Sequence, residues 1–114
     1  MAKTKEFFFK EGCFIEEWHN TSNDEDCSVA RVRVEGEETT KLHALEYTTE
    51  RYIILEGSAD VTVGDETWFV TTGDVVVIPP GVAQKITNLG KSDLIFLAVC
   101  SPRFQEENYV ELKE

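Results

Sequence analysis

The chain has 114 residues, which is enough for one domain with a single hydrophobic core. Its 22 acidic residues outnumber 11 basic ones, giving a formal net charge of −11. No basic stripe offsets this charge, so we expect no nucleic-acid partner. The longest apolar run, residues 75–78, is far shorter than the ~20 residues that span a membrane, and no signal-peptide pattern opens the chain. We therefore expect a cytoplasmic protein without a membrane partner.

Residues 1–10 form an N-terminal arm in which lysines flank three consecutive phenylalanines, Phe7, Phe8 and Phe9. Side chains alternate along a strand, so three adjacent aromatic residues cannot all face the interior of one barrel. We expect some of them to be covered by a second subunit or by a strand that crosses the barrel. The arm therefore predicts a cross-subunit strand and a homodimer.

The rest of the chain shows the pattern of an all-β protein. Residues 13–18 and 28–34 predict two strands joined by an acidic loop, and in the second strand apolar and arginine residues alternate cleanly. From residue 57 to residue 90 glycines recur every seven to nine residues, between β-branched and aromatic segments. Residues 101–114 are largely polar and predict a tail along the outside of the barrel. We expect residues 1–114 to form a single domain with little helix.

Two segments carry glycine, proline and polar residues at regular spacings. The first runs through Gly36, His43, Leu45, Glu50 and Gly57, and the second through Gly73, Pro79, Gly81, Gln84 and Asn88. Together they resemble the two motifs of the cupin superfamily, Gly-x5-His-x-His-x3–4-Glu-x6-Gly and Gly-x5-Pro-x-Gly-x2-His-x3-Asn. The second segment fits at every spacing, whereas His43 is displaced by one residue from Gly36. The resemblance spans about residues 36–88 and implies a double-stranded β-helix, or jelly-roll, barrel.

The resemblance also implies a metal site. In metal-binding cupins two histidines and a glutamate of the first motif, with the histidine of the second, hold a divalent metal ion inside the barrel. Carried over to this chain, the ligands are His43, Glu50 and Gln84, while Leu45 replaces a usual ligand and offers no donor atom. The neutral Gln84 oxygen is a poor ligand for zinc or iron. The set implies one weakly held divalent ion (Zn, Fe, Mn or Ni), with a metal-free site as the alternative.

The period-two rule places several polar side chains on three strand faces. These faces hold Lys41, His43 and Leu45; Glu50, Tyr52 and Ile54; and Gln84, Ile86 and Asn88. If the faces converge in a closed barrel, they enclose a small-molecule pocket, and Cys100 or its neighbours line the same space. His43, Glu50 and Tyr52 are then candidate catalytic residues, and Lys41 and Gln84 are candidate substrate-binding residues.

Each of these residues also has a purely structural interpretation. His43 is consistent with a core histidine bonded to Glu50, and Lys41 with a structural ion pair to the same carboxylate. Tyr52 is consistent with a packed aromatic residue, and Gln84 with a cap on the loop that precedes it.

Three functions therefore remain open at the level of sequence. The first is a metal-dependent enzyme of dioxygenase, isomerase or lyase type acting on a small polar metabolite. The second is metal-free acid–base catalysis by His43 and Glu50. The third is a non-catalytic barrel that binds or senses a small ligand and has lost its metal. The pattern does not decide whether the protein is an enzyme.

Overall fold

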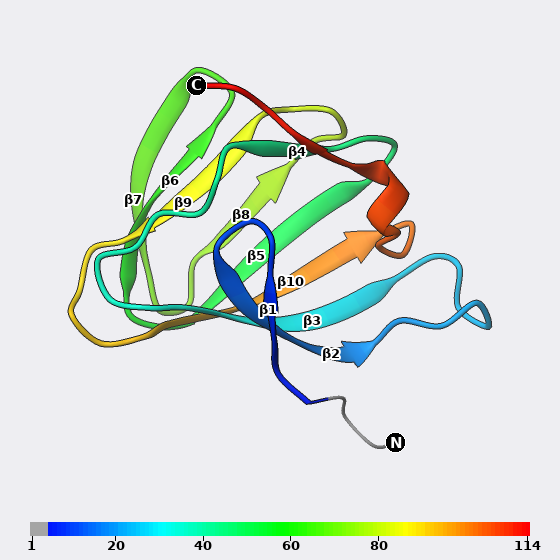
Figure 1. The fold of residues 1–114 in the computed structure, drawn as a ribbon, viewed down its shortest axis with the longest axis horizontal. Coiled ribbons are helices and arrows are strands. Elements are labelled where there is room, and N and C mark those ends of the chain that lie inside the picture. The colour runs from blue at the N-terminus through cyan, green and yellow to red at the C-terminus, as the bar shows by residue number, and fades with distance from the viewer. Residues whose placement is uncertain (1–4) are drawn as a thin grey trace.

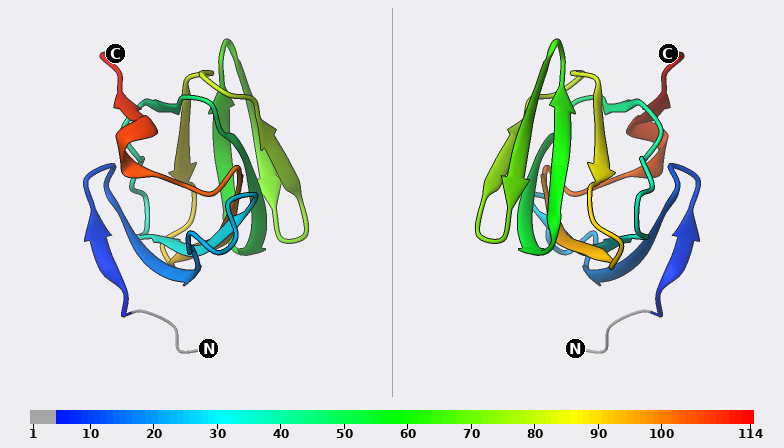
Figure 2. Two further views of the ribbon diagram at one scale, coloured as in Figure 1. Left: turned by 90° about the vertical axis from the view of Figure 1, so that its right-hand side faces the viewer. Right: turned by 90° about the vertical axis from the view of Figure 1, so that its left-hand side faces the viewer.

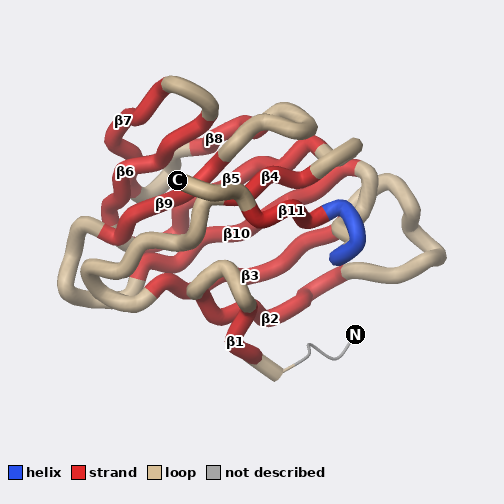
Figure 3. Tube along the Cα trace, turned by 45° about the horizontal axis from the view of Figure 1, so that its top comes forward, coloured by secondary structure: helices blue, strands red, loops and turns tan. Residues whose placement is uncertain are grey.

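The computed structural model describes residues 5–114, and almost all of its regular structure is β-strand (Figure 1). The strands are β1 (Phe7–Phe9), β2 (Cys13–His19), β3 (Ser28–Val34), β4 (His43–Leu45), β5 (Thr49–Glu56), β6 (Ser58–Val63), β7 (Glu66–Thr71), β8 (Val75–Ile78), β9 (Gln84–Asn88), β10 (Leu94–Ser101) and β11 (Tyr109–Glu111). A single 3-10 turn, η1 (Glu106–Asn108), precedes the last strand (Figure 3). No helix in the described part of the chain is long and apolar enough to cross a membrane.

The strands form two antiparallel sheets that face each other, as the edge-on views in Figure 2 show. The six-stranded sheet has the order β1-β2-β3-β10-β5-β8, and the five-stranded sheet has the order β11-β4-β9-β6-β7. Neighbours far apart in sequence, such as β3 with β10, pair over their full length. This double sheet with crossing connections confirms the predicted jelly-roll barrel.

Alternation along β5 shows how the sequence directs side chains inward. Glu50, Tyr52 and Ile54 are buried, whereas Arg51 and Ile53 between them are only half-buried. The same alternation holds along β9, where Gln84, Ile86 and Asn88 are buried. The predicted inner faces of both strands are therefore correct, and they meet in the core between the sheets.

Residues of the two sequence motifs also hold the turns at one end of the barrel. Asn88 Nδ2 donates hydrogen bonds to the carbonyls of Val34 (3.0 Å) and Ser92 (2.8 Å), and its Oδ1 accepts one from the Gly90 amide (2.9 Å). A Cβ atom at Gly36 would overlap the backbone carbonyl of Lys91, so this close approach requires glycine. Asn88 and Gly36 therefore serve the framework.

The N-terminal arm, from residue 5 onward, pairs within its own chain. β1 lies at the edge of the six-stranded sheet and pairs with β2. Phe9 faces the core and is buried, whereas Phe7 and Phe8 are 42% and 63% exposed. Phe8 packs edge-to-face on Phe14, with 5.2 Å between ring centroids. Residues 1–4 lie outside the described residues, so the predicted cross-subunit strand stays a prediction.

The C-terminal segment differs in part from the expected exterior tail. β11 pairs with β4 and extends the five-stranded sheet (Figure 3). Alternation along this short strand turns Tyr109 inward, where it is only 8% exposed, and leaves Val110 half-buried. The prediction was wrong for Tyr109 because the segment joins the sheet as a strand and so presents one face to the core.

Candidate functional site

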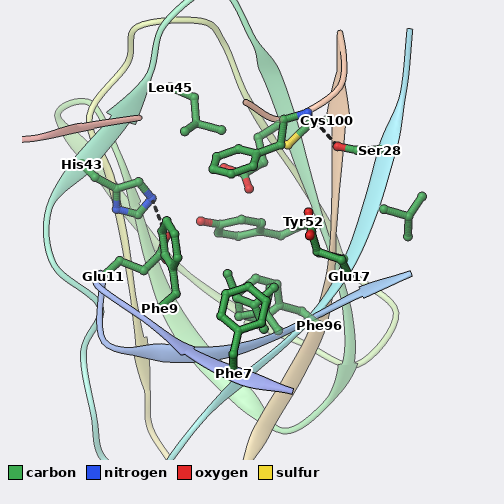
Figure 4. A pocket seen from close by; sticks show the side chains of 17 residues that line it. Phe7, Phe9, Glu11, Glu17, Ser28, His43, Leu45, Tyr52, Phe96 and Cys100 are labelled. Atoms are coloured by element: carbon green, nitrogen blue, oxygen red, sulfur yellow. Dashed lines mark hydrogen bonds and ion pairs between the residues drawn. The ribbon is translucent and has the colours of Figure 1, made fainter. Parts of the chain in front are cut away.

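A cavity of about 60 Å³ lies between the sheets, beside the β1–β2 turn (Figure 4). Its walls are mostly apolar and aromatic, and its polar groups come from separate elements. These polar groups are Glu11, Glu17, Ser28, His43, Glu50, Tyr52 and Cys100. A volume of this size accommodates a few water molecules or a very small organic molecule.

His43, the first residue of β4, is 2% exposed, and its hydrogen bonds define its tautomer. Its Nδ1 lies 2.6 Å from the Lys41 carbonyl oxygen, which can only accept, so Nδ1 carries the proton. The Nε2 atom therefore keeps its lone pair. Burial lowers the pKa of the imidazole, because the charged ring loses its hydration. His43 is a neutral base, and its ring stacks on Tyr109 at 5.0 Å.

Glu11 faces His43, and sequence reasoning did not identify it. Its Oε1 lies 3.6 Å from His43 Nε2, which is longer than a hydrogen bond. Burial raises the pKa of Glu11 to about 8, and the negative charge of Glu50 adds to this rise. At neutral pH the Glu11 carboxyl is therefore mostly protonated.

Glu11 escaped sequence analysis because it lies in the short turn between β1 and β2, where a charged residue predicts exposure. This turn instead packs on the barrel, where the Lys41 amide donates a hydrogen bond of 2.8 Å to the Glu11 carbonyl. The flanking Phe9 and Cys13 are both buried. The apolar residues two positions before and after Glu11 were the available signal for its burial.

Glu50 lies on the inner face of β5 and reaches the cavity. Burial raises its pKa to about 7, while Gln84 and the Cys100 thiol act in the opposite direction. Its Oε1 atom is buried and has no hydrogen-bond partner within residues 5–114. The Gln84 side chain accepts a hydrogen bond of 2.5 Å from the Tyr52 hydroxyl, and its Nε2 likewise lacks a partner among the described residues.

The structure thus brings most of the predicted site together. His43, Glu50 and Tyr52 line the cavity, as does Cys100, and the fully buried Gln84 contacts Tyr52 beside it. Leu45 contributes to the apolar wall.

The predicted place of Lys41 in the cavity was wrong, since Lys41 is exposed. β4 begins only at His43, so the alternation does not extend back to Lys41. Lys41 contributes its backbone carbonyl to His43, and it forms no ion pair with Glu50.

Comparison with known families decides the assignment. Residues 30–100 match the family described as the cupin domain, which covers more than half of the chain. The chain belongs to the cupin family. Protein MJ1618 of Methanocaldococcus jannaschii is 32% identical over 108 residues, covering 93% of this cupin and 86% of that protein. The xanthan biosynthesis protein XanB of Xanthomonas campestris is 32% identical over 80 residues, but this cupin spans only 17% of its length.

Solved structures agree on the fold. Pac13 of Streptomyces, described as a unique nucleoside dehydratase, superposes with a TM-score of 0.81 at 16% identity, covering 96% of this cupin and 85% of Pac13. KdgF from Halomonas gives a TM-score of 0.79 at 17% identity, with 90% of each chain covered. Oxalate decarboxylase gives 0.81 at 24% identity, covering 95% of this cupin and 30% of that chain. Because all three sequence identities are below 25%, these comparisons show that the fold is shared and nothing more.

The oxalate decarboxylase of Bacillus subtilis, which shares this fold, has Mn(II) centres. The donor set of this cupin does not fit a metal ion. Within residues 5–114 no group of three His, Cys, Asp or Glu side chains is arranged to hold a metal ion. The Gln84 oxygen already accepts the Tyr52 hydroxyl, and Leu45 occupies a ligand position.

Proposed function

We propose that the cavity is a metal-independent acid–base site that acts on a small molecule. The observation that carries this proposal is the facing pair of His43 Nε2 and Glu11 Oε1, 3.6 Å apart inside the barrel. The hydrogen bond from Nδ1 leaves Nε2 as the basic atom of the imidazole, and burial favours the protonated form of Glu11. Burial raises the pKa of the acid, Glu11, and lowers the pKa of the base, His43. Such a pair is suited to proton transfer near neutral pH.

An elimination of water illustrates the proton balance. His43 Nε2 accepts a proton from a carbon of the substrate, and the Glu11 carboxyl donates its proton to the departing hydroxyl group, which leaves as water. The imidazolium and the carboxylate that remain then exchange one proton and restore the starting state. An isomerisation uses the same two groups, with the proton returned to a different carbon. Pac13, which shares this fold, is a dehydratase, and this is in keeping with elimination chemistry inside such a barrel.

The test is a search for turnover without metal. EDTA-treated protein is incubated with fractionated small metabolites in D2O, and mass spectrometry follows loss of water or gain of deuterium. His43→Gln and Glu11→Gln should each lower the rate by ~100-fold or more, since a lost acid or base typically costs that factor. Lys41→Gln, at an exposed position, is the matched control and should keep the rate.

Two outcomes would contradict the proposal. Turnover that depends on an added divalent ion would show that the residues hold a metal after all. Turnover that survives in His43→Gln would remove the imidazole from the reaction.

A second candidate function is ligand binding without catalysis. Leu45 supports it, because an apolar side chain stands where metal-binding cupins have a histidine. The readout that separates the two is stabilisation of the fold by a metabolite with no product detected from it. We propose a cytoplasmic location for either function, in keeping with the free thiols of Cys13, Cys27 and Cys100.

A further inference from the structure

The cavity carries an unusual combination of charge and aromatic surface. Three carboxyl side chains line it, those of Glu11, Glu17 and Glu50, whereas no lysine or arginine of the described residues does. Its one imidazole is held neutral by burial. The aromatic lining residues are Phe7, Phe9, Tyr52, Phe96 and Phe104. Such a lining places no fixed positive charge beside a bound cation, and it offers the cation carboxyl oxygens and the faces of aromatic rings.

Glu50 supplies an independent sign of a missing ligand. Glu50 is only 8% exposed, and its side chain lines the cavity. One of its oxygens, Oε1, has no hydrogen-bond partner in residues 5–114. A buried carboxyl oxygen without a partner is costly, so a group that donates a hydrogen bond to it from the cavity would stabilise the site.

The aromatic rings nearby already attract a cation on their outer side. The Lys10 ammonium lies 4.7 Å from the ring centroid of Tyr109 and 5.7 Å from that of Phe9. It is also paired with Glu106 at 3.2 Å, outside the cavity. Phe9 therefore offers one ring to a cation outside the barrel while lining the cavity within it.

We propose that the small molecule bound in this cavity is an organic cation, an amine or a methylated ammonium, with the Glu50 carboxylate as its counter-ion. This inference rests on the proposed function, for which it names the substrate class. Glu50 then binds the cationic group, while Glu11 and His43, which face each other, stay available for proton transfer (Figure 4).

A path into the cavity is consistent with this substrate class. Phe7, Phe9, Glu17 and Phe104 line both the cavity and an open groove on the surface. The residues shared by the cavity and the groove thus carry three aromatic rings and one carboxylate, whose Oε2 accepts a hydrogen bond of 3.0 Å from Asn20. Lys10 and Arg103 also line the groove, and each is paired with a glutamate, Glu106 at 3.2 Å and Glu25 at 2.9 Å. The net charge of −11 raises the local concentration of cations around the whole molecule.

The proposal is tested with pairs of probes that match in size and differ in charge. Trimethylammonium and tert-butanol are titrated separately into the wild-type protein at one ionic strength, fixed with NaCl, and binding is followed by NMR. Methylammonium and acetate form a second, smaller pair. We expect each cation to bind at least about tenfold more tightly than its partner, because only the cation gains the counter-ion and the ring faces.

Glu50→Gln keeps the shape of the side chain and removes its charge, so it should weaken binding of trimethylammonium at least tenfold. Lys41→Gln, outside the cavity, is the control and should bind as the wild type does. Equal binding of trimethylammonium and tert-butanol, or preference for acetate, would overturn the proposal even if Glu50→Gln fails to fold, because these probes use the wild-type protein.

The same probes separate this inference from the proposed function. Turnover and binding of trimethylammonium are therefore both measured on the wild-type protein. Selective cation binding by a protein that turns over no amine would remove the acid–base proposal and leave the cation site standing. Turnover of neutral substrates alone, without selective binding of cations, would remove the cation site and leave the acid–base proposal standing.

Discussion

At the scale of single residues, two tyrosine hydroxyls in the core have opposite surroundings. The Tyr52 hydroxyl donates to Gln84 Oε1 on the inner side of the barrel. The Tyr109 hydroxyl is buried without a partner among residues 5–114. A buried hydroxyl that forms a hydrogen bond stabilises the fold, whereas a buried hydroxyl without a partner destabilises it. The two tyrosines can therefore be compared by mutation.

Tyr52→Phe should lower the free energy of unfolding by about 1–3 kcal/mol, because it removes the hydrogen-bond donor of the buried Gln84 Oε1 atom. Tyr109→Phe should leave the free energy of unfolding unchanged or raise it slightly, since it removes only an unsatisfied group. Urea unfolding of both variants at pH 7 measures the difference. Equal losses of stability would contradict the assigned hydrogen bonding.

Residue identity also shows where sequence reasoning succeeds and where it stops. The alternation along β5 predicted that Glu50 and Tyr52 point inward, and both line the cavity. The same rule failed for Lys41, because alternation holds only within a strand and β4 starts two residues later. The predicted ion pair between Lys41 and Glu50 was wrong for the same reason.

At the scale of elements, the β1–β2 hairpin closes one side of the cavity. Phe9 and Glu11 reach the cavity from this hairpin, and Ile15 follows on β2. Its turn is tied to the segment before β4 through the backbone bond from Lys41 to Glu11. The hairpin places in the barrel a carboxyl group that a turn would normally expose to water.

The hairpin therefore makes stability depend on pH. The pKa of Glu11 is about 8 in the folded chain against 4.5 as its ordinary value, so between these values the folded state binds more protons than the unfolded state. The free energy of unfolding should then fall as pH rises from 5 to 8. Urea unfolding at pH 5, 6, 7 and 8 measures this slope.

The matched variant is Glu11→Gln, which cannot titrate. It should make the slope shallower by on the order of 1–3 kcal/mol over this range, because one pKa unit corresponds to ~1.4 kcal/mol. A slope that is the same in both proteins would mean that Glu11 titrates near its ordinary pKa and is not buried in solution.

The elements at the chain ends explain why the site was only partly predictable. Glu11 comes from the first hairpin, and Tyr109, which stacks on His43, comes from the last strand. Both lie outside the two spaced motifs that identified the barrel. Which terminal residues reach the interior depends on how the ends pack on the barrel, and local alternation carries no information about that.

At the scale of the whole molecule, the exposed aromatic surface bears on assembly. Phe7 and Phe8 lie on the edge strand β1 and remain 42% and 63% exposed. An edge strand with exposed aromatic side chains is open to pairing with another chain. We predict a homodimer through this edge.

The double variant Phe7→Ser, Phe8→Ser should shift the protein from dimer to monomer, with Phe9 and hence the core untouched. The control is Phe69→Ser on β7, at the edge of the other sheet, where Phe69 is 59% exposed. Light scattering after gel filtration gives the mass of each. A double variant with the same mass as the wild type would exclude β1 as the interface.

The three thiols have a practical consequence for studies in solution. Cys13 and Cys100 are buried and burial raises the pKa of each, so neither forms a reactive thiolate readily. Cys27 is only half-buried and lies just before β3. A maleimide fluorophore should therefore attach at this one position in the native protein, which provides a spectroscopic reporter without any engineered cysteine.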